Sequence, residues 1–290
     1  MNNIESKVIV TGASNGIGRA VACAVSLPED ASVNGIDIRA SVREFQEKSM
    51  RVSVKILLAA IVFSAVSITG IKEARTMDTG LNARQQSIVA ISAYTADGEL
   101  EKLKTALNEG LDAGLTVNEI KEVLVQLYAY TGFPRSLNGI HTFMGVMDER
   151  RAKGIKDETG KEAAPLPADL NRDEYGAKVR ARLAGQETIP PPSGYQLFAP
   201  AIDSFLKEHL FADIFARDNL DFQSRELATI SALAAMSGTA GQLQFHFGAA
   251  MNVGFTKAQM KHFIAVIDSK VGNRQAEAAD FVLEKVLADR

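Results

Sequence analysis

The first residues whose types and spacing could do chemistry form a glycine-rich turn. Residues 7–10 (KVIV) predict a short buried strand, and residues 11–20 (TGASNGIGRA) follow at once, before an apolar stretch that predicts a helix. Glycines between a strand and a helix let the backbone approach a pyrophosphate, and the helix N-terminus attracts its charge. A second predicted strand, residues 33–38, carries Asp37, whose carboxylate could accept a hydrogen bond from a ribose hydroxyl. The pattern is typical of dinucleotide binding.

This opening resembles the start of the short-chain dehydrogenase/reductase family, whose glycine pattern it matches at Gly12, Gly16 and Gly18. The resemblance covers residues 1–45 only, and the Tyr-x-x-x-Lys motif of that family occurs nowhere in the chain. Without this pair the acid for hydride transfer is missing, and without further strands a βαβ unit leaves its sheet edge uncovered. We therefore interpret residues 1–49 as a truncated Rossmann-like leader with a vestigial glycine loop, and we expect no cofactor to bind there.

The composition excludes several kinds of site. Cys23 is the one cysteine in 290 residues, which excludes an internal disulfide and a zinc site built from several thiolates. No His-x-x-x-His pair occurs, so the sequence predicts no metal site. The formal net charge is −3, so the chain lacks the excess of positive charge that is typical of nucleic-acid-binding proteins. We expect a globular protein without cofactor, metal or nucleic-acid partner.

Residues 50–76 predict a signal-peptide-like segment. Two basic residues precede an apolar run over residues 56–66, which is shorter than the about 20 residues that a membrane-spanning helix needs. A basic start and a short apolar core are typical of a secretory signal peptide, and a buried core helix is the alternative. If translation starts at Met50, we expect export to the periplasm or the medium. If residues 1–49 are retained, we expect a cytoplasmic protein. In neither case do we expect a stable membrane span.

The remainder of the chain contains an internal repeat and has helical patterning throughout. LNARQQSIVAISA at residues 81–93 matches LDFQSRELATISA at residues 220–232. Further on, DAGLTVNEIK at residues 112–121 matches NVGFTKAQMK at residues 252–261. Similarity at a fixed offset predicts two copies of one structural unit.

Each copy predicts the same helix boundaries. Gly114 stands where a helix would end, and Thr116 with Glu119 predicts a capping box at the start of the next one. Thr256 and Gln259 predict the same cap in the second copy. The matching caps predict that the two copies share one order of helices.

A break inside the first copy and a polar stretch between the copies complete the predicted organisation. Residues 132–134 (GFP) end a long helix and begin another, with the proline in its first turn. The predicted repeats are residues 77–150 and 198–290, and the second opens with a helix over residues 198–215. Residues 151–197 are polar and proline-rich, which predicts a linker.

These repeats resemble the carboxymuconolactone decarboxylase family, which includes alkylhydroperoxidase D-like proteins. The strings GLTVNEIKEVLVQLYAYTGFPRSLNGI, RELATISALAA and HFGAAMNVGFT carry the resemblance. It implies an all-α fold of two tandem helical repeats. It also implies self-association, since members typically form trimers or hexamers.

One branch of that family is the thiol peroxidases, which use a Cys-x-x-Cys pair with a glutamate upstream and a histidine just after. The resemblance places Glu122 and His141 at the glutamate and histidine positions, but Pro134 and Leu137 at the cysteine positions. The thiolate is the nucleophile of that mechanism. The resemblance therefore implies that this protein is not a thiol peroxidase.

The decarboxylase branch needs no thiol, because loss of CO2 from a lactone acid requires a bound carboxylate, a delocalised anion and a proton donor. The resemblance implies Glu122, His141 and His246 as catalytic groups. It implies Arg135 as the side chain that binds the acid. His246 opens an H-x-x-x-A-x-x-x-G-x-T stretch typical of this branch, where the first copy has Ala106. We hypothesise one pocket between the copies, or between subunits, with the other position degenerate.

The expected function is cofactor-free decarboxylation or proton transfer on a small organic (lactone) acid. The first alternative is a non-catalytic oligomeric scaffold or small-molecule-binding protein, in which Glu122 is an exposed acid paired with a lysine and His246 is a hydrogen-bonded core histidine. The second alternative, a nicotinamide-dependent reductase, rests on the truncated leader alone. A pocket between the repeats lined by converging histidine, glutamate and arginine side chains would favour the enzyme. An apolar pocket, or none, would favour the scaffold.

Overall fold

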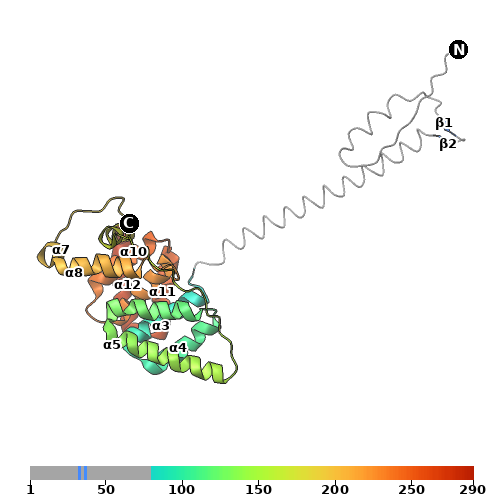
Figure 1. The fold of residues 1–290 in the computed structure, drawn as a ribbon, viewed down its shortest axis with the longest axis horizontal. Coiled ribbons are helices and arrows are strands. Elements are labelled where there is room, and N and C mark those ends of the chain that lie inside the picture. The colour runs from blue at the N-terminus through green and yellow to red at the C-terminus, as the bar shows by residue number, and fades with distance from the viewer. Residues whose placement is uncertain (1–31, 34–35, 38–79) are drawn as a thin grey trace, which may run out of the picture. The chain divides into compact units, whose positions relative to one another are not determined.

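The computed structural model describes residues 32–33, 36–37 and 80–290 (Figure 1). The chain divides into two compact units, Met1–Met77 and Asp78–Arg290. The predicted glycine-rich turn and the predicted signal-like segment lie outside the described residues.

The four described residues of the first unit form a short antiparallel pair, β1 (Ser32–Val33) with β2 (Ile36–Asp37). Val33 pairs with Ile36, and Ser32 pairs with Asp37. The sequence instead predicted one continuous strand over residues 33–38. The sequence between β1 and β2, Asn-Gly, is the dipeptide most favoured in two-residue hairpins, a signal that the prediction of one strand did not use.

All regular secondary structure in the described part of the second unit is helical (Figure 1). The first repeat consists of α3 (Ala83–Asp97), α4 (Leu100–Asp112) and α5 (Val117–Ala152). The second repeat consists of α9 (Phe222–Ala235), α10 (Ala240–Asn252), α11 (Lys257–Lys270) and α12 (Asn273–Ala288). Between them lie α6 (Arg172–Leu183), α7 (Tyr195–Phe198), α8 (Pro200–Ser204) and the π-helix η1 (Phe205–Ile214). Residues 80–290 contain no strand, as the all-α prediction requires. None of the described helices is both long and apolar enough to cross a membrane.

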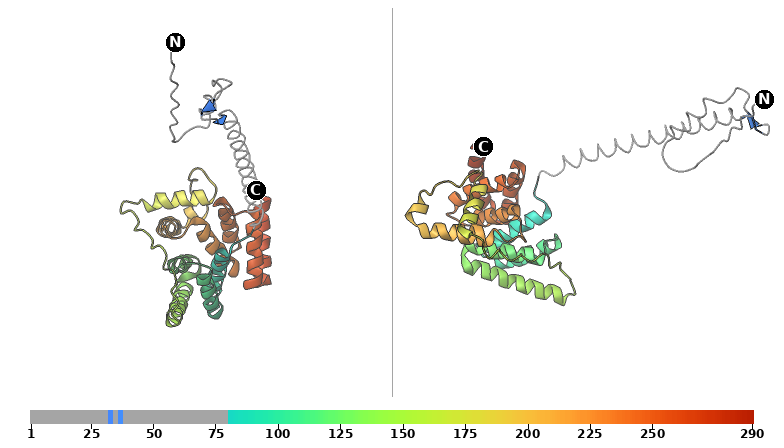
Figure 2. Two further views of the ribbon diagram at one scale, coloured as in Figure 1. Left: turned by 90° about the vertical axis from the view of Figure 1, so that its right-hand side faces the viewer. Right: turned by 45° about the horizontal axis from the view of Figure 1, so that its top comes forward.

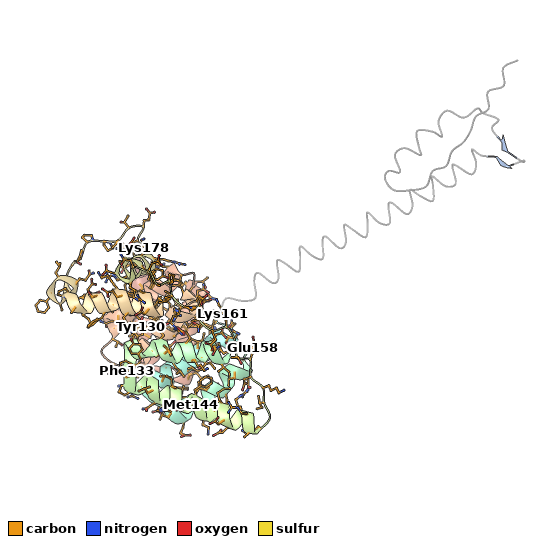
Figure 3. All side chains as sticks on the ribbon, in the orientation of Figure 1. Tyr130, Phe133, Met144, Glu158, Lys161 and Lys178 are labelled. Atoms are coloured by element: carbon orange, nitrogen blue, oxygen red, sulfur yellow. The ribbon has the colours of Figure 1, made fainter. Side chains whose placement is uncertain are left out.

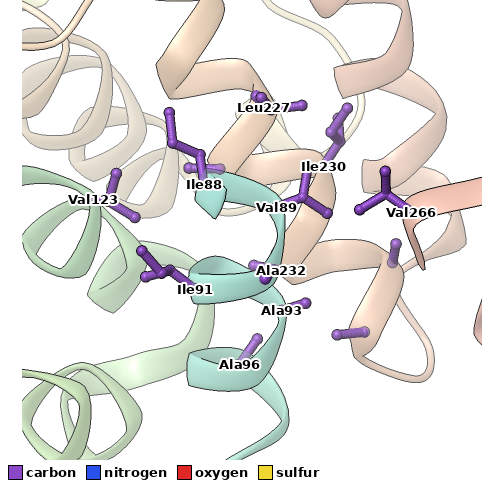
Figure 4. Packing of buried hydrophobic residues seen from close by; sticks show 14 of the residues in the cluster. Ile88, Val89, Ile91, Ala93, Ala96, Val123, Leu227, Ile230, Ala232 and Val266 are labelled. Atoms are coloured by element: carbon purple, nitrogen blue, oxygen red, sulfur yellow. The ribbon is translucent and has the colours of Figure 1, made fainter. Parts of the chain in front are cut away.

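The core is centred on α3 and α9, the equivalent helices of the two repeats, which pack against each other. Both are buried on all sides over most of their length, which is typical of a central helix. Figure 4 shows side chains of α3 between Val123 of α5 on one side and Ile230 of α9 and Val266 of α11 on the other. The two repeats therefore share one hydrophobic core.

The predicted helix boundaries of the repeats are confirmed. Gly114 follows the end of α4 with a φ of 89°, the left-handed conformation that favours glycine. The Thr116 side chain accepts from the backbone N–H of Glu119, whose carboxylate in turn accepts from the backbone N–H of Thr116. Thr256 and Gln259 form the same reciprocal cap at the start of α11.

The predicted break at residues 132–134 is a kink inside α5. Gly132 has φ 76° and ψ 161°, a conformation that is open almost only to glycine. Beyond the kink α5 folds back on its own first part, where the Ser136 hydroxyl donates to the Leu124 carbonyl at 2.8 Å. The kink leaves Tyr130 at the end of the straight segment.

The segment between the repeats is more structured than the linker that the sequence predicted. It contains α6, which packs on η1 and on α10 (the yellow and orange helices of Figure 2). The buried face of α6 consists largely of small residues, which give a weak hydrophobic pattern, and its Gly176 lies directly against the carbonyl of Lys207. The single helix expected over residues 198–215 is divided into α7, α8 and η1.

Candidate functional site

A cluster of buried polar side chains lies where the two repeats meet. Glu122, Gln126 and Tyr130 recur every four residues along α5, so they share one face of that helix. That face packs against α9 of the other repeat. We call the following residues the inter-repeat cluster: Glu122, Gln126, Tyr130, Arg217, Arg225, Glu226, Thr229 and His246. Figure 3 labels Tyr130 within the helical unit.

One end of the cluster is built on Arg225, which is completely buried. Its Nη2 donates to Oε1 of Glu122 at 2.9 Å, and its Nη1 donates to Oε1 of Gln126 at 2.9 Å. The Gln126 amide donates in turn to the Arg225 carbonyl and to the Thr229 hydroxyl. Burial lowers the pKa of Arg225 and the carboxylate of Glu122 opposes this effect. An arginine nevertheless stays charged in a protein, so this is a buried ion pair.

Glu122 holds a second guanidinium at the same end. The Nε of Arg217 donates to both carboxylate oxygens of Glu122, at 2.9 and 3.0 Å. The Glu122 side chain is 1% exposed, whereas the Arg217 side chain is 39% exposed. One buried carboxylate therefore lies between two arginines, and one of these reaches the surface.

The other end of the cluster is a histidine–glutamate pair. Nδ1 of His246 lies 2.8 Å from Oε2 of Glu226, and the two side chains are 7% and 0% exposed. A carboxylate oxygen accepts hydrogen bonds, so Nδ1 carries the hydrogen of this contact and Nε2 is the nitrogen left to exchange a proton with a ligand. The rings of Tyr130 and Phe245 approach the imidazole edge-on, with centroids at 5.5 and 5.1 Å. This arrangement fixes both the tautomer and the orientation of a potential acid–base group.

Three polar atoms of the cluster are buried without a protein partner among the described residues. They are Oε1 of Glu226, the hydroxyl of Tyr130 and Nε of Arg225. Burial raises the pKa of Tyr130, and the nearby charge of Glu226 raises it further, so the hydroxyl keeps its proton. Buried polar atoms without partners are uncommon in folded proteins, and a group of them marks a candidate site.

The structure places the four residues that the sequence singled out in two different surroundings. Glu122 and His246 both belong to the inter-repeat cluster, and the alternative of Glu122 as an exposed acid is wrong. Arg135 and His141 lie on exposed positions of α5 beyond its kink. Neither makes a hydrogen bond to the cluster among the described residues, and the guanidinium of Arg135 lies against Gly98 at the end of α3. The catalytic or binding roles of all four stay predictions.

Six members of the cluster were not singled out from the sequence: Gln126, Tyr130, Arg217, Arg225, Glu226 and Thr229. Arg225 and Glu226 stand in the RELATISA string. They are the two charged residues of an otherwise uncharged helix, and such a pair in an apolar helix indicates a buried polar contact. Tyr130 follows Glu122 and Gln126 at helical spacing, which is a weaker signal. Nothing in the sequence indicates Arg217, because its position depends on how η1 joins α9.

The pseudo-equivalent interface, between α3 and α11, lacks these groups. The counterparts of Arg225, Glu226, His246 and Glu122 are Gln86, Ser87, Ala106 and His262. His262 is a structural residue here, since its Nδ1 accepts from the backbone N–H of Leu81 at 2.7 Å. The chemical groups are therefore concentrated at one of the two interfaces, in line with the hypothesis of one degenerate position.

No residue of the inter-repeat cluster lines the large surface hollows found in the described part of the chain. Surface hollows of about 290 and 470 Å³ lie elsewhere, the first at the starts of α3, α5 and α9 and the second between α6, α10 and α12. No group of three potential metal ligands occurs in the described part of the chain. The cluster reaches the surface through the exposed parts of Arg217 and Tyr130 and the small exposed part of His246.

Comparison with known proteins gives two matches to the repeats. The model of the carboxymuconolactone decarboxylase family matches residues 67–142 and 200–285, which together make up more than half of the chain. The chain is also similar to the 4-carboxymuconolactone decarboxylase of Acinetobacter baylyi, with 26% identity over 122 residues that cover 42% of this chain and 90% of that protein. With both repeats matched, the chain belongs to the carboxymuconolactone decarboxylase family.

Proposed function

We propose that this protein catalyses cofactor-free decarboxylation or proton transfer on a small organic acid of the lactone type, at the inter-repeat cluster. The observation that carries the proposal is the pairing of His246 with Glu226 at 2.8 Å, buried between the two repeats. Because the similar protein of Acinetobacter baylyi is a 4-carboxymuconolactone decarboxylase, 4-carboxymuconolactone is the first substrate to test.

The proposed step uses His246 as the proton donor. The bond between the ring carbon and the carboxylate breaks, CO2 leaves, and the electron pair delocalises into the conjugated lactone carbonyl. The protonated Nε2 of His246 then delivers its proton to the carbon, and the imidazole takes up a proton from solvent. Glu226 stabilises the protonated imidazole through Nδ1, so it acts as a positioning residue.

Glu122 has a different role in this proposal from the proton transfer that the resemblance implied. Its two oxygens already accept hydrogen bonds from Arg217 and Arg225, which favour the ionised carboxylate. A carboxylate held in this way is a poor proton donor. We assign Glu122 to positioning the two guanidinium groups.

The test is turnover by the full-length chain. We expect release of CO2 from 4-carboxymuconolactone above the rate in buffer, and no turnover of an organic hydroperoxide in the presence of a thiol reductant. Turnover of the peroxide contradicts the proposal, because the repeats contain no cysteine. Absence of CO2 release with retained binding of the acid favours the scaffold or small-molecule-binding alternative.

Self-association belongs to the same proposal. Beyond its kink α5 presents three large apolar side chains to the surface, Phe133, Leu137 and Met144, and two of them are labelled in Figure 3. Exposed apolar patches of this kind mark interaction surfaces. We propose that copies of the chain associate through this part of α5.

A further inference from the structure

Arg217 has more hydrogen-bonding capacity than the protein uses. Its Nε is committed to Glu122, whereas its Nη1 and Nη2 groups have no hydrogen-bond partner among the described residues. With 39% of its side chain exposed, it is the member of the cluster with the widest access to solvent. A guanidinium offers paired N–H donors whose geometry matches a carboxylate.

The local fold holds Arg217 in place. The π-helix η1 ends at Ile214, and π-helical segments are rare and frequently lie at functional sites. Phe215 follows, with its ring centroid 5.8 Å from the Arg225 guanidinium, and the carbonyl of Arg217 accepts from Nη2 of Arg225 at 2.7 Å. The backbone and the Nε of Arg217 are both anchored, so the two Nη groups are presented in a fixed direction.

The charges at this end of the cluster do not balance. Two guanidinium groups share the single carboxylate of Glu122, which leaves an excess of one positive charge. The carboxylate of Glu226 lies at the other end, where it is hydrogen-bonded to Nδ1 of His246. Uncompensated charge in a partly buried site is unfavourable, so an anion bound at Arg217 would be stabilised.

We propose that Arg217 binds a carboxylate of the substrate through its two Nη groups, while the reacting carbon lies near His246. The second half of this statement rests on the proposed function. On α5, Glu122 lies at one end of the inter-repeat cluster and Tyr130 at the other. They are eight residues apart, or about 12 Å along the helix. A ligand that reaches both ends is an organic acid with a carboxylate remote from its reacting carbon, and not a small inorganic anion. Arg217 takes the place that the sequence gave to Arg135.

The test uses Arg217→Gln in the full-length chain, with Arg172→Gln as the matched control. Arg172 is also a half-exposed arginine whose Nε donates to a carboxylate, that of Asp213, but it lies outside the cluster. Binding is measured by calorimetry with 4-carboxymuconolactone in a His246→Asn background, which separates binding from turnover. We expect Arg217→Gln to weaken binding about 10- to 100-fold, the loss typical for hydrogen bonds to charged groups, and Arg172→Gln to leave it unchanged.

Kinetics of the chain with His246 intact give a second readout. We expect Arg217→Gln to raise KM by a similar factor with little change in kcat, because an anchor remote from the reacting carbon contributes equally to the ground state and the transition state. Arg217→Lys keeps the charge beside Glu122 but loses the paired donors. We expect its KM to lie between that of the parent and that of Arg217→Gln. Thermal unfolding of the variants shows whether they fold, since Arg225 still partners Glu122.

The proposal and the proposed function fail in different ways. CO2 release with KM and binding unaffected by Arg217→Gln overturns the carboxylate anchor and leaves the decarboxylase proposal standing. A loss of affinity in Arg135→Gln instead of Arg217→Gln, or no measurable binding to the His246→Asn protein, also overturns the anchor. Binding that depends on Arg217 in a chain that releases no CO2 supports the anchor and contradicts the decarboxylase.

Discussion

At the scale of single residues, Glu122 shows how burial changes the meaning of a sequence motif. Its position in the family pattern implied a proton-transfer group. In the structure its carboxylate accepts hydrogen bonds from two guanidinium groups, one of which is completely buried. Its main effect is electrostatic, because Arg225 has no other carboxylate partner among the described residues.

Replacement of Glu122 by glutamine tests this role. The glutamine keeps nearly the same shape but removes the charge, so the buried guanidinium of Arg225 loses its counter-ion. We expect a loss of about 3–5 kcal/mol in the free energy of unfolding, the usual cost of breaking a buried ion pair from one side. Urea unfolding measures it. Glu119→Gln, one turn earlier on α5, is the control: glutamine preserves the capping box, so we expect a loss within about 1 kcal/mol. Equal losses in the two variants contradict the assignment.

At the scale of helices, the kink in α5 decides where the cluster ends. Gly132 adopts a conformation that side chains avoid, and the chain reverses there so that Gly139 packs against Leu124 and Thr95. A straight helix would carry residues 133–152 away from the core. The kink therefore defines the surroundings of Tyr130.

Gly132→Ala is expected to cost about 1–3 kcal/mol, because a Cβ atom is strained at φ 76° and ψ 161°. Gly145→Ala in the same helix is the matched control. A Cβ atom at Gly145 meets nothing within 4 Å, so we expect no loss, or a gain of up to about 1 kcal/mol from helix propensity. Chemical denaturation of the two variants compares them directly. A Gly132→Ala protein as stable as Gly145→Ala would show that the kink is not set by the backbone conformation of glycine.

The segment between the repeats is held by ion pairs, and one of them joins Asp203 to Arg180. Burial of Asp203 opposes ionisation, but hydrogen bonds from Arg180 and Gln196 outweigh it and lower the pKa of Asp203. A lowered pKa in the folded state stabilises the fold above the unfolded value of about 3.9, and this contribution is lost as the pH falls below about 4. We expect Asp203→Asn to be less stable at pH 7, with a difference from the parent that shrinks below pH 4. Urea midpoints across pH 3–7 measure it, and a difference independent of pH contradicts the account.

At the scale of the whole molecule, both repeats contribute side chains to the inter-repeat cluster. α5 of the first repeat supplies Glu122 and Tyr130, and the second repeat supplies Glu226 and His246. The sequence predicted the repeats, their caps and the break at Gly132, because those signals are local. It did not predict α6 or the π-helical form of η1, whose small or irregular faces have no clear periodicity.

The site could be predicted only in part, because its contacts depend on how distant helices pack together. Glu122 and His246 each stand in a recognisable motif. The pairing of Glu122 with Arg217 and Arg225 joins residues about one hundred positions apart, and it depends on how α5 packs against α9. The exposed positions of Arg135 and His141 likewise follow from the direction of α5 beyond its kink. The spacing of residues in a motif determines neither the packing of α5 against α9 nor the direction of α5 beyond its kink.

Self-association is expected to depend on the apolar surface of α5 beyond its kink. Met144→Lys places a charge on a side chain that is 59% exposed, so we expect the monomer to fold normally and the assembly to weaken. Light scattering at several protein concentrations measures the mass. Lys153→Met, at the exposed end of the same helix, is a control expected to keep the parent mass. A parent protein that is monomeric at all concentrations contradicts this prediction.

His246 is the proposed acid–base group of the inter-repeat cluster, and CO2 release by two histidine variants tests this role most directly. His246→Asn removes the acid–base nitrogen, whereas His262→Asn changes a histidine whose hydrogen bond to Leu81 is structural. With 4-carboxymuconolactone as substrate, we expect His246→Asn to lower kcat by about 10²- to 10⁴-fold, the usual contribution of general acid–base catalysis. We expect His262→Asn to keep the parent kcat. A His246→Asn protein that releases CO2 at the parent rate would contradict the account.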